Sequence, residues 1–206
     1  TMSGENLSID TAEKRRTLHI VLWLNVAIAI GFFASGWAGD SNALLANGLD
    51  NSSDAIVYAL SLLTLTRSAI WKRSAARLSG IMLLLFAVGV VFDAVRRFIE
   101  GSEPLGLVML GMAGIAAVVN LICLWLLKRI EHKDVNLRAA TTFSFNDLIS
   151  NGGIIVAGVI VLWTGSNWPD LIVGLAVAAI AAYGGVDILQ DAQTDKDWAS
   201  KAQSAD

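Results

Sequence analysis

The chain has 206 residues, of which 55% are hydrophobic and 16% are charged, and its mean hydropathy is +0.60. A soluble domain does not need so apolar a composition to fill its core, so the sequence predicts a membrane protein whose main partner is the lipid bilayer. The 15 Lys and Arg residues are outnumbered by 18 Asp and Glu residues, which leaves no basic footprint and excludes nucleic acid as a partner.

Six apolar runs are each long enough to cross a hydrocarbon core of about 30 Å, which takes about 20 residues. All six are predicted to be helices, because a lone strand in lipid would leave its backbone polar groups unpaired. The fold class expected is therefore an all-α membrane protein with six transmembrane helices. The predicted spans are Leu18–Ala38, Asn42–Thr66, Ala76–Phe98, Leu105–Leu127, Leu137–Trp163 and Leu171–Leu189.

These spans divide the chain into three regions. Residues 1–17 form a polar N-terminal segment, residues 18–190 form a six-helix transmembrane domain, and residues 191–206 form a short polar tail. The tail has no hydrophobic periodicity that would build a folded domain, so no C-terminal domain is expected. We therefore expect the membrane helices to carry the function.

The distribution of basic residues predicts the orientation in the membrane. The connectors at residues 39–41, 100–104 and 164–170 contain no Lys or Arg, whereas the N-terminal segment and the other two connectors contain several. By the positive-inside rule, both termini are predicted to be cytoplasmic. Arg96 and Arg97 are exceptions, and their spacing from Asp93 predicts ion pairs along one helix. Asp40, just before the second span, is predicted to be an N-cap.

Three aspartates lie inside predicted spans, where an ionisable residue costs several kcal/mol unless it is paired or hydrated. Asp50 and Asp54 are four residues apart in the second span and share a helix face, while Asp147 lies in the fifth span. No Lys or Arg lies within two helical turns of them. A bound cation or protons must therefore supply the missing positive charge, which makes these residues candidates for a cation site.

Polar neighbours extend this face on both helices. Asn47 and Tyr58 continue the stripe of Asp50 and Asp54, and Ser144 and Asn151 share the face of Asp147. Oxygen ligands from two facing helices suit a divalent cation. Single polar residues such as Asn25 and Asn120 are explained by hydrogen bonds between helices instead.

Other residues with metal-binding side chains are predicted to have different roles. Cys123, the only cysteine, is expected to be a buried hydrophobe, and His132 is expected to be a solvated loop residue. Asp187, near the end of the last span, is expected at the membrane interface. Gly152, Gly153 and Gly158 are expected where helices approach closely.

The second-span sequence DSNALLANGLDNSSDAIVYALSLL and the fifth-span sequence FSFNDLISNGGIIVAGVIV, together with the six spans, resemble the cation diffusion facilitator family of divalent-metal transporters. The resemblance runs from about Leu18 to Gln190. In that family the second and fifth helices each carry His or Asp followed four residues later by Asp. Asp50, Asp54 and Asp147 match three of these positions, and Phe143 stands at the fourth.

This resemblance implies a three-carboxylate version of a four-ligand metal site. Water, Asn47 or Asn151 would complete the ligand shell, and Asn146 is less well placed because it is turned about 100° from Asp147. The resemblance also implies the cation-efflux transmembrane-domain fold, without the C-terminal metal-binding domain and the His-rich loop that many relatives carry.

The function implied by the resemblance is secondary active efflux of divalent cations, with Zn²⁺ and also Cd²⁺ as transported substrates and protons as the exchanged ion. A homodimer formed through transmembrane helices, no prosthetic group and no enzymatic activity are expected. The expected location is a bacterial inner membrane. The alternatives are a Mn²⁺ or Fe²⁺ transporter of the same fold, a passive cation channel, and a scaffold that binds metal without moving it.

Overall fold

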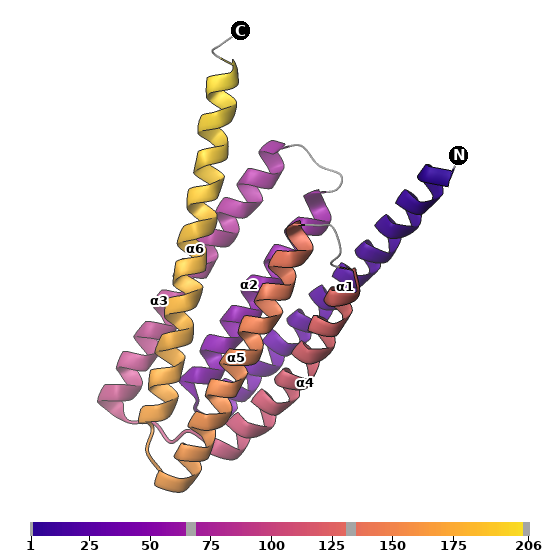
Figure 1. Ribbon diagram of the computed structural model, residues 1–206. Helices are drawn as coiled ribbons and strands as arrows, with labels where there is room; N and C mark the ends of the chain where they lie inside the picture. Colours follow the sequence, from indigo (N-terminus) through magenta and orange to yellow (C-terminus); the bar gives the residue numbers. More distant parts are fainter. Residues whose placement is uncertain (1, 65–68, 131–134, 204–206) are drawn as a thin grey trace.

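The computed structural model describes residues 2–64, 69–130 and 135–203, which form six helices packed side by side in one bundle (Figure 1). Each predicted span coincides with one of these helices, so the all-helical fold class is confirmed. The helices are α1 (Met2–Ala38), α2 (Asn42–Thr64), α3 (Ala69–Glu100), α4 (Gly106–Ile130), α5 (Val135–Thr164) and α6 (Trp168–Gln203).

Among the six described helices, four are long and apolar enough to cross a membrane: α1, α4, α5 and α6. Their apolar stretches are Arg15–Ala38, Gly106–Arg129, Ser144–Thr164 and Trp168–Gln190. Judged on the residues that the structure describes, α2 and α3 do not meet the same combined measure of length, hydropathy and number of charged residues. Four predicted spans are thus supported, while the crossings by α2 and α3 stay predictions.

The polar ends of the chain continue the helices beyond the predicted spans. The first helix begins at Met2, well before Leu18, and the last runs on to Gln203. Both termini lie at the same end of the bundle, which we call the termini end (Figure 1). The opposite end holds the connectors at residues 39–41, 101–105 and 165–167, and we call it the connector end.

Two glycines with left-handed backbones end helices at the connector end. Gly101, with φ of +86°, follows the end of α3, and Gly165, with φ of +66°, follows the end of α5. The three connectors are also bonded to one another, since the Leu105 N–H donates to the Gly39 carbonyl at 2.9 Å and the Asn167 side-chain amide donates to the Ser102 hydroxyl oxygen at 3.1 Å. This end of the bundle is therefore tied together by hydrogen bonds between connectors.

The second helix lies at the centre of the bundle, where it packs against each of the other five helices. One apolar cluster includes Phe32 of α1, Leu44 of α2 and Met109 of α4. Another joins α2 to α3 and α6 and includes Leu49 and Leu83. The polar residues of α2 consequently face protein on most sides.

Glycines allow α4 and α5 to approach closely. A Cβ atom added to Gly106 would lie 2.6 Å from the carbonyl oxygen of Gly158, which is closer than real Cβ atoms come. The expectation of a close helix contact is confirmed at Gly158. It is wrong for Gly152, where an added Cβ would meet nothing within 4 Å because that face of α5 is open.

Candidate metal-transport site

A cavity of about 400 Å³ lies between α2, α5 and α6, and it brings together the three aspartates singled out in the sequence. Asp50 and Asp54 come from α2, and Asp147 comes from α5. The remaining lining residues among those described are Ser53, Asn146, Ile149, Ser150, Ile180, Ala181, Tyr183, Gly184 and Asp187. The predicted pairing of the second and fifth spans around one polar site is therefore found in the fold.

Asp147 is in contact with both of the other aspartates. Asp54 and Asp147 are 6% and 2% exposed, and Asp50 is half-buried. The carboxyl groups of Asp50 and Asp54 each share a hydrogen bond with that of Asp147. Two ionised carboxylates repel, so each of these contacts needs a proton or a cation between the oxygens.

Further buried oxygens at the site have no hydrogen-bond partner. Among the described residues, Oδ2 of Asp54 and Oδ2 of Asp147 are both buried and unpartnered. A buried acceptor without a donor is costly, which leaves these atoms available to a ligand that supplies positive charge. In the described part of the chain, no three His, Cys, Asp or Glu side chains lie in an arrangement that would hold one metal ion without some movement.

Asn47 and Asn151 lie one helical turn from the aspartates and are bonded to each other. The Asn47 amide nitrogen donates to Oδ1 of Asn151 at 2.8 Å, and both side chains are fully buried. Neither is among the described residues that line the cavity. The side-chain oxygen of Asn151 accepts this hydrogen bond, whereas the side-chain oxygen of Asn47, Oδ1, has no hydrogen-bond partner in the described structure.

The structure also revises two details of the site. Asn146 lines the cavity although the helical angle had made it the less suitable candidate. Asp187, expected at the interface, lines the same cavity from α6 as an exposed fourth carboxylate. The angle between Asn146 and Asp147 around α5 gives no information about where α6 lies. On α6, Tyr183 and Asp187 are four residues apart and therefore share one face, which lines the cavity.

The remaining candidate residues lie as follows. Tyr58 and Ser144 are buried next to the aspartates and share a side-chain hydrogen bond. Cys123 is fully buried in an apolar cluster with Val21, so its predicted role as a buried hydrophobe is confirmed. His132 lies outside the described residues, as does the side chain of Phe143.

A carboxylate from α6 fixes the start of α2. The buried Asp170 side chain accepts hydrogen bonds from the Ser41 hydroxyl at 2.5 Å, the Asn42 N–H at 2.7 Å and the Ala43 N–H at 3.1 Å. These backbone donors belong to the first turn of α2, which has no internal acceptors for them. Asp170 therefore caps α2 from a neighbouring helix and sets the position of the helix that carries Asp50 and Asp54.

The prediction that Asp40 caps α2 is wrong. The hydroxyl oxygen of Ser41 accepts the Leu44 N–H at 3.1 Å and is the N-cap. Asp40 has a left-handed backbone, with φ of +49°, and its carboxylate pairs with Arg97 of α3. The predicted ion pairs of Asp93 with Arg96 and Arg97 are confirmed, at 2.8 and 2.5 Å.

Comparison with known proteins defines the class of protein. Residues 18–194 match the family of the cation efflux transmembrane domain. This match covers most of the chain, so the chain belongs to the cation efflux family, the cation diffusion facilitator family that its motifs resemble. Members of this family are transporters and not enzymes. The match and the four apolar helices make the chain an integral membrane protein.

Several bacterial transporters are similar to the chain in sequence. Zinc transporter ZitB of Escherichia coli (strain K12) is 29% identical over 175 residues, which are 79% of this chain and 55% of that protein. Zinc transporter ZitB of Yersinia pestis is 30% identical over 164 residues, 70% of this chain and 51% of that protein. A cadmium, cobalt and zinc/H(+)-K(+) antiporter of Bacillus subtilis (strain 168) is 25% identical over 170 residues, which are 76% of this chain and 55% of that protein. The chain spans about half the length of these relatives.

Proposed function

We propose that the chain carries divalent cations, with Zn²⁺ as the main substrate and Cd²⁺ as a second, out of a bacterial cell across the inner membrane in exchange for protons. The observation that carries this proposal is the contact of Asp50, Asp54 and Asp147 in one cavity between helices of a membrane protein. The names of the similar bacterial transporters, which refer to zinc and cadmium, support the choice of ions.

The charge at the site accounts for the exchange of metal and protons. Among its described lining residues the cavity has carboxylates but no Lys or Arg, so protons or a dication must balance the negative charge. A metal ion needs deprotonated ligands, so its arrival displaces the protons held between the aspartates. On the opposite side of the membrane, protons returning to the same oxygens release the metal.

The proposed ligands are the carboxylates of Asp50, Asp54 and Asp147, supplemented by the amide pair next to them. The free Oδ1 of Asn47 supplies a further oxygen, and Asn151 orients the Asn47 side chain through its hydrogen bond. Carboxylate and amide oxygens bind first-row divalent ions in general, which keeps Mn²⁺ and Fe²⁺ as alternative substrates.

We place all six helices across the membrane with both termini in the cytoplasm. The basic residues of the N-terminal segment and of the connectors on the same side support this orientation. The helix α6 runs from the connector end towards the termini end, and Asp187 is the last of its described residues along the cavity, so we place Asp187 on the cytoplasmic side of the cavity. An exposed carboxylate there attracts cations into the cavity.

We place the homodimer contact on α3. Large apolar side chains on this helix are exposed at alternating spacings of three and four residues, the repeat that favours packing of two helices along one seam. Reconstituted protein with Val88→Cys is expected to cross-link into dimers, whereas Val118→Cys on the exposed face of α4 is not. The seam residues are Leu78, Ile81, Leu85, Val88, Phe92, Val95 and Ile99.

Transport is tested with purified protein in liposomes under an imposed pH gradient, while zinc entry and internal pH are recorded together. We expect zinc flux with opposite proton movement, and we expect both to be lost in Asp147→Asn. Glu103→Gln is the matched control, because it also removes one carboxylate but lies exposed in the connector before α4.

The possible outcomes separate the competing functions. Zinc flux without proton movement would identify a passive channel. No flux of Zn²⁺, Cd²⁺ or Mn²⁺, with metal binding retained, would identify a scaffold and refute transport. Loss of flux in Glu103→Gln as well as in Asp147→Asn would show that the carboxylates are not the specific site.

A further inference from the structure

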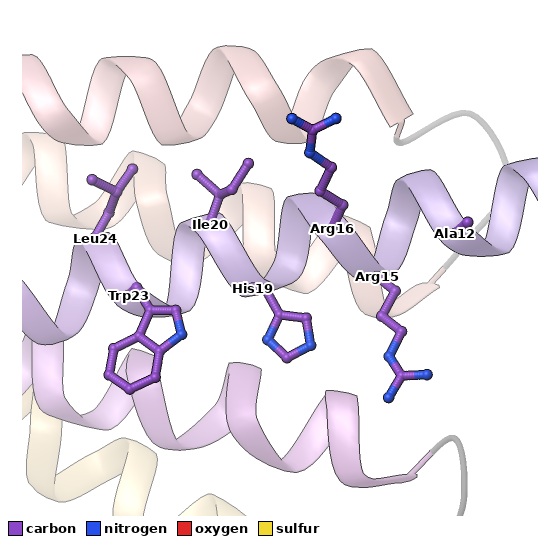
Figure 2. A pocket seen from close by; sticks show the side chains of 7 residues that line it. All are labelled: Ala12, Arg15, Arg16, His19, Ile20, Trp23 and Leu24. Carbon is purple, nitrogen blue, oxygen red and sulfur yellow. The ribbon is translucent and has the colours of Figure 1, made fainter.

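A second hollow, of about 710 Å³, runs along the surface of α1 near the start of its apolar stretch (Figure 2). Its described lining comes from α1, in two rows with four-residue spacing. Arg15, His19 and Trp23 project to one side of the helix in Figure 2, and Arg16, Ile20 and Leu24 project to the other. We call this surface the α1 groove.

One end of the α1 groove is cationic. Arg15, Arg16 and His19 are exposed, and they lie at the first turns of the stretch Arg15–Ala38 that is apolar enough to cross a membrane. Among the residues whose side chains the structure describes, Arg96 and Arg97 both pair with Asp93, whereas no carboxylate pairs with Arg15 or Arg16. These two guanidinium groups are therefore available to an external anion at the membrane surface.

The other end of the groove is apolar and exposed, within the stretch of α1 that is apolar enough to cross a membrane. Trp23 is 65% exposed and Ile20 is 39% exposed. Eight residues of helix separate Arg15 from Trp23, which places the indole about 12 Å deeper along the axis. A ligand that fits the whole groove must carry a negative charge at the water boundary and a hydrocarbon chain below it.

We propose that the α1 groove binds an anionic phospholipid of the leaflet at the termini end. The phosphate accepts hydrogen bonds from Arg15, Arg16 and His19, and an acyl chain packs along Ile20, Trp23 and Leu24. A soluble phosphate lacks the chain that the apolar part of the groove accommodates. A zwitterionic lipid carries its own ammonium group, which competes with the arginines for the phosphate.

The proposal is tested by counting bound lipid on the whole protein with native mass spectrometry after reconstitution in phosphatidylcholine, with and without phosphatidylglycerol. We expect phosphatidylglycerol to be retained by the wild type. The double variant Arg15→Gln with Arg16→Gln should bind it about twenty-five-fold more weakly, roughly fivefold for each arginine. Trp23→Ala keeps the charges and should also retain less lipid, because the acyl chain loses its contact.

A second basic pair gives the matched control. Lys128 and Arg129 lie in the last turn of α4 and are also exposed, and Arg129 stacks on Trp125 at 3.6 Å. Lipid retention should be unchanged when both are replaced by Gln. Equal loss in the two double variants, no loss in the α1 variant, or full displacement of the lipid by inorganic phosphate would each overturn the proposal. Because the readout is bound lipid, it is independent of whether the protein transports metal.

Discussion

Replacement of Asp170 by Ala tests the interaction that fixes the first turn of α2. The side chain is fully buried and accepts three hydrogen bonds, from Ser41, Asn42 and Ala43, which are themselves fully buried. Alanine removes both acceptor oxygens, and with them all three hydrogen bonds. The helix that carries Asp50 and Asp54 would then begin with unpaired donors inside the bundle.

The expected cost follows from these three donors. An unsatisfied buried donor costs about 1–3 kcal/mol, and a single lost helix cap costs about 0.5–2 kcal/mol. Taking the low end for each donor, Asp170→Ala should lower the free energy of unfolding by about 3 kcal/mol. In a chain of this size that corresponds to a fall of roughly 6–12 °C in the unfolding midpoint.

The assay is the fraction of protein that stays monodisperse on size-exclusion chromatography after heating in detergent. Asp170→Asn keeps one acceptor oxygen and should lose about 1 kcal/mol. Asp187→Asn removes an exposed carboxylate from the same helix and should leave the midpoint unchanged. A midpoint for Asp170→Ala within error of the wild type would refute the idea that this carboxylate supports α2.

Three further predictions concern the ion pairs, the cavity and the helix contacts. Arg97→Gln should lower the free energy of unfolding by about 2 kcal/mol in the same heating assay, because its buried guanidinium group pairs with two carboxylates; an unchanged midpoint would argue against this role. Asp187→Asn should raise the KM for zinc flux about three- to tenfold at low ionic strength, because the variant loses the attraction of the carboxylate for incoming cations. The increase should be much smaller at high salt, where that attraction is screened, and a change independent of salt would contradict the prediction. Gly106→Val should destabilise the protein because its side chain would collide with the Gly158 carbonyl, and Gly152→Val, on an open face, should be tolerated.

Much of the site was predictable because it depends on the periodicity of individual helices. Four-residue spacing placed Asp50 and Asp54 on one face of α2, and the cost of a carboxylate in an apolar segment marked Asp147. The structure brings all three to one cavity. The ion pairs of Asp93 with Arg96 and Arg97 followed from the same local rule.

The residues that were missed depend on contacts between helices that are distant in sequence. Asp187 and Asn146 line the cavity because of where α6 lies against α5, and spacing within one helix does not determine that. Asp40 was assigned as a cap because it precedes α2, but the acceptors for the first turn come from Ser41 and from Asp170, which lies more than a hundred residues later. Local rules identify that a helix start needs an acceptor, and only the tertiary fold determines which side chain supplies it.

The polarity of α2 follows from its central position in the bundle. This helix packs against all five others, so its Asn and Asp side chains meet protein or the cavity and need little contact with lipid. A helix on the outside of the bundle must be apolar on its exposed face, as α4 is at Ile115 and Val118. The Asn and Asp side chains that make α2 polar also supply the proposed cation site, because a site for a charged substrate requires uncompensated carboxylates where lipid does not reach.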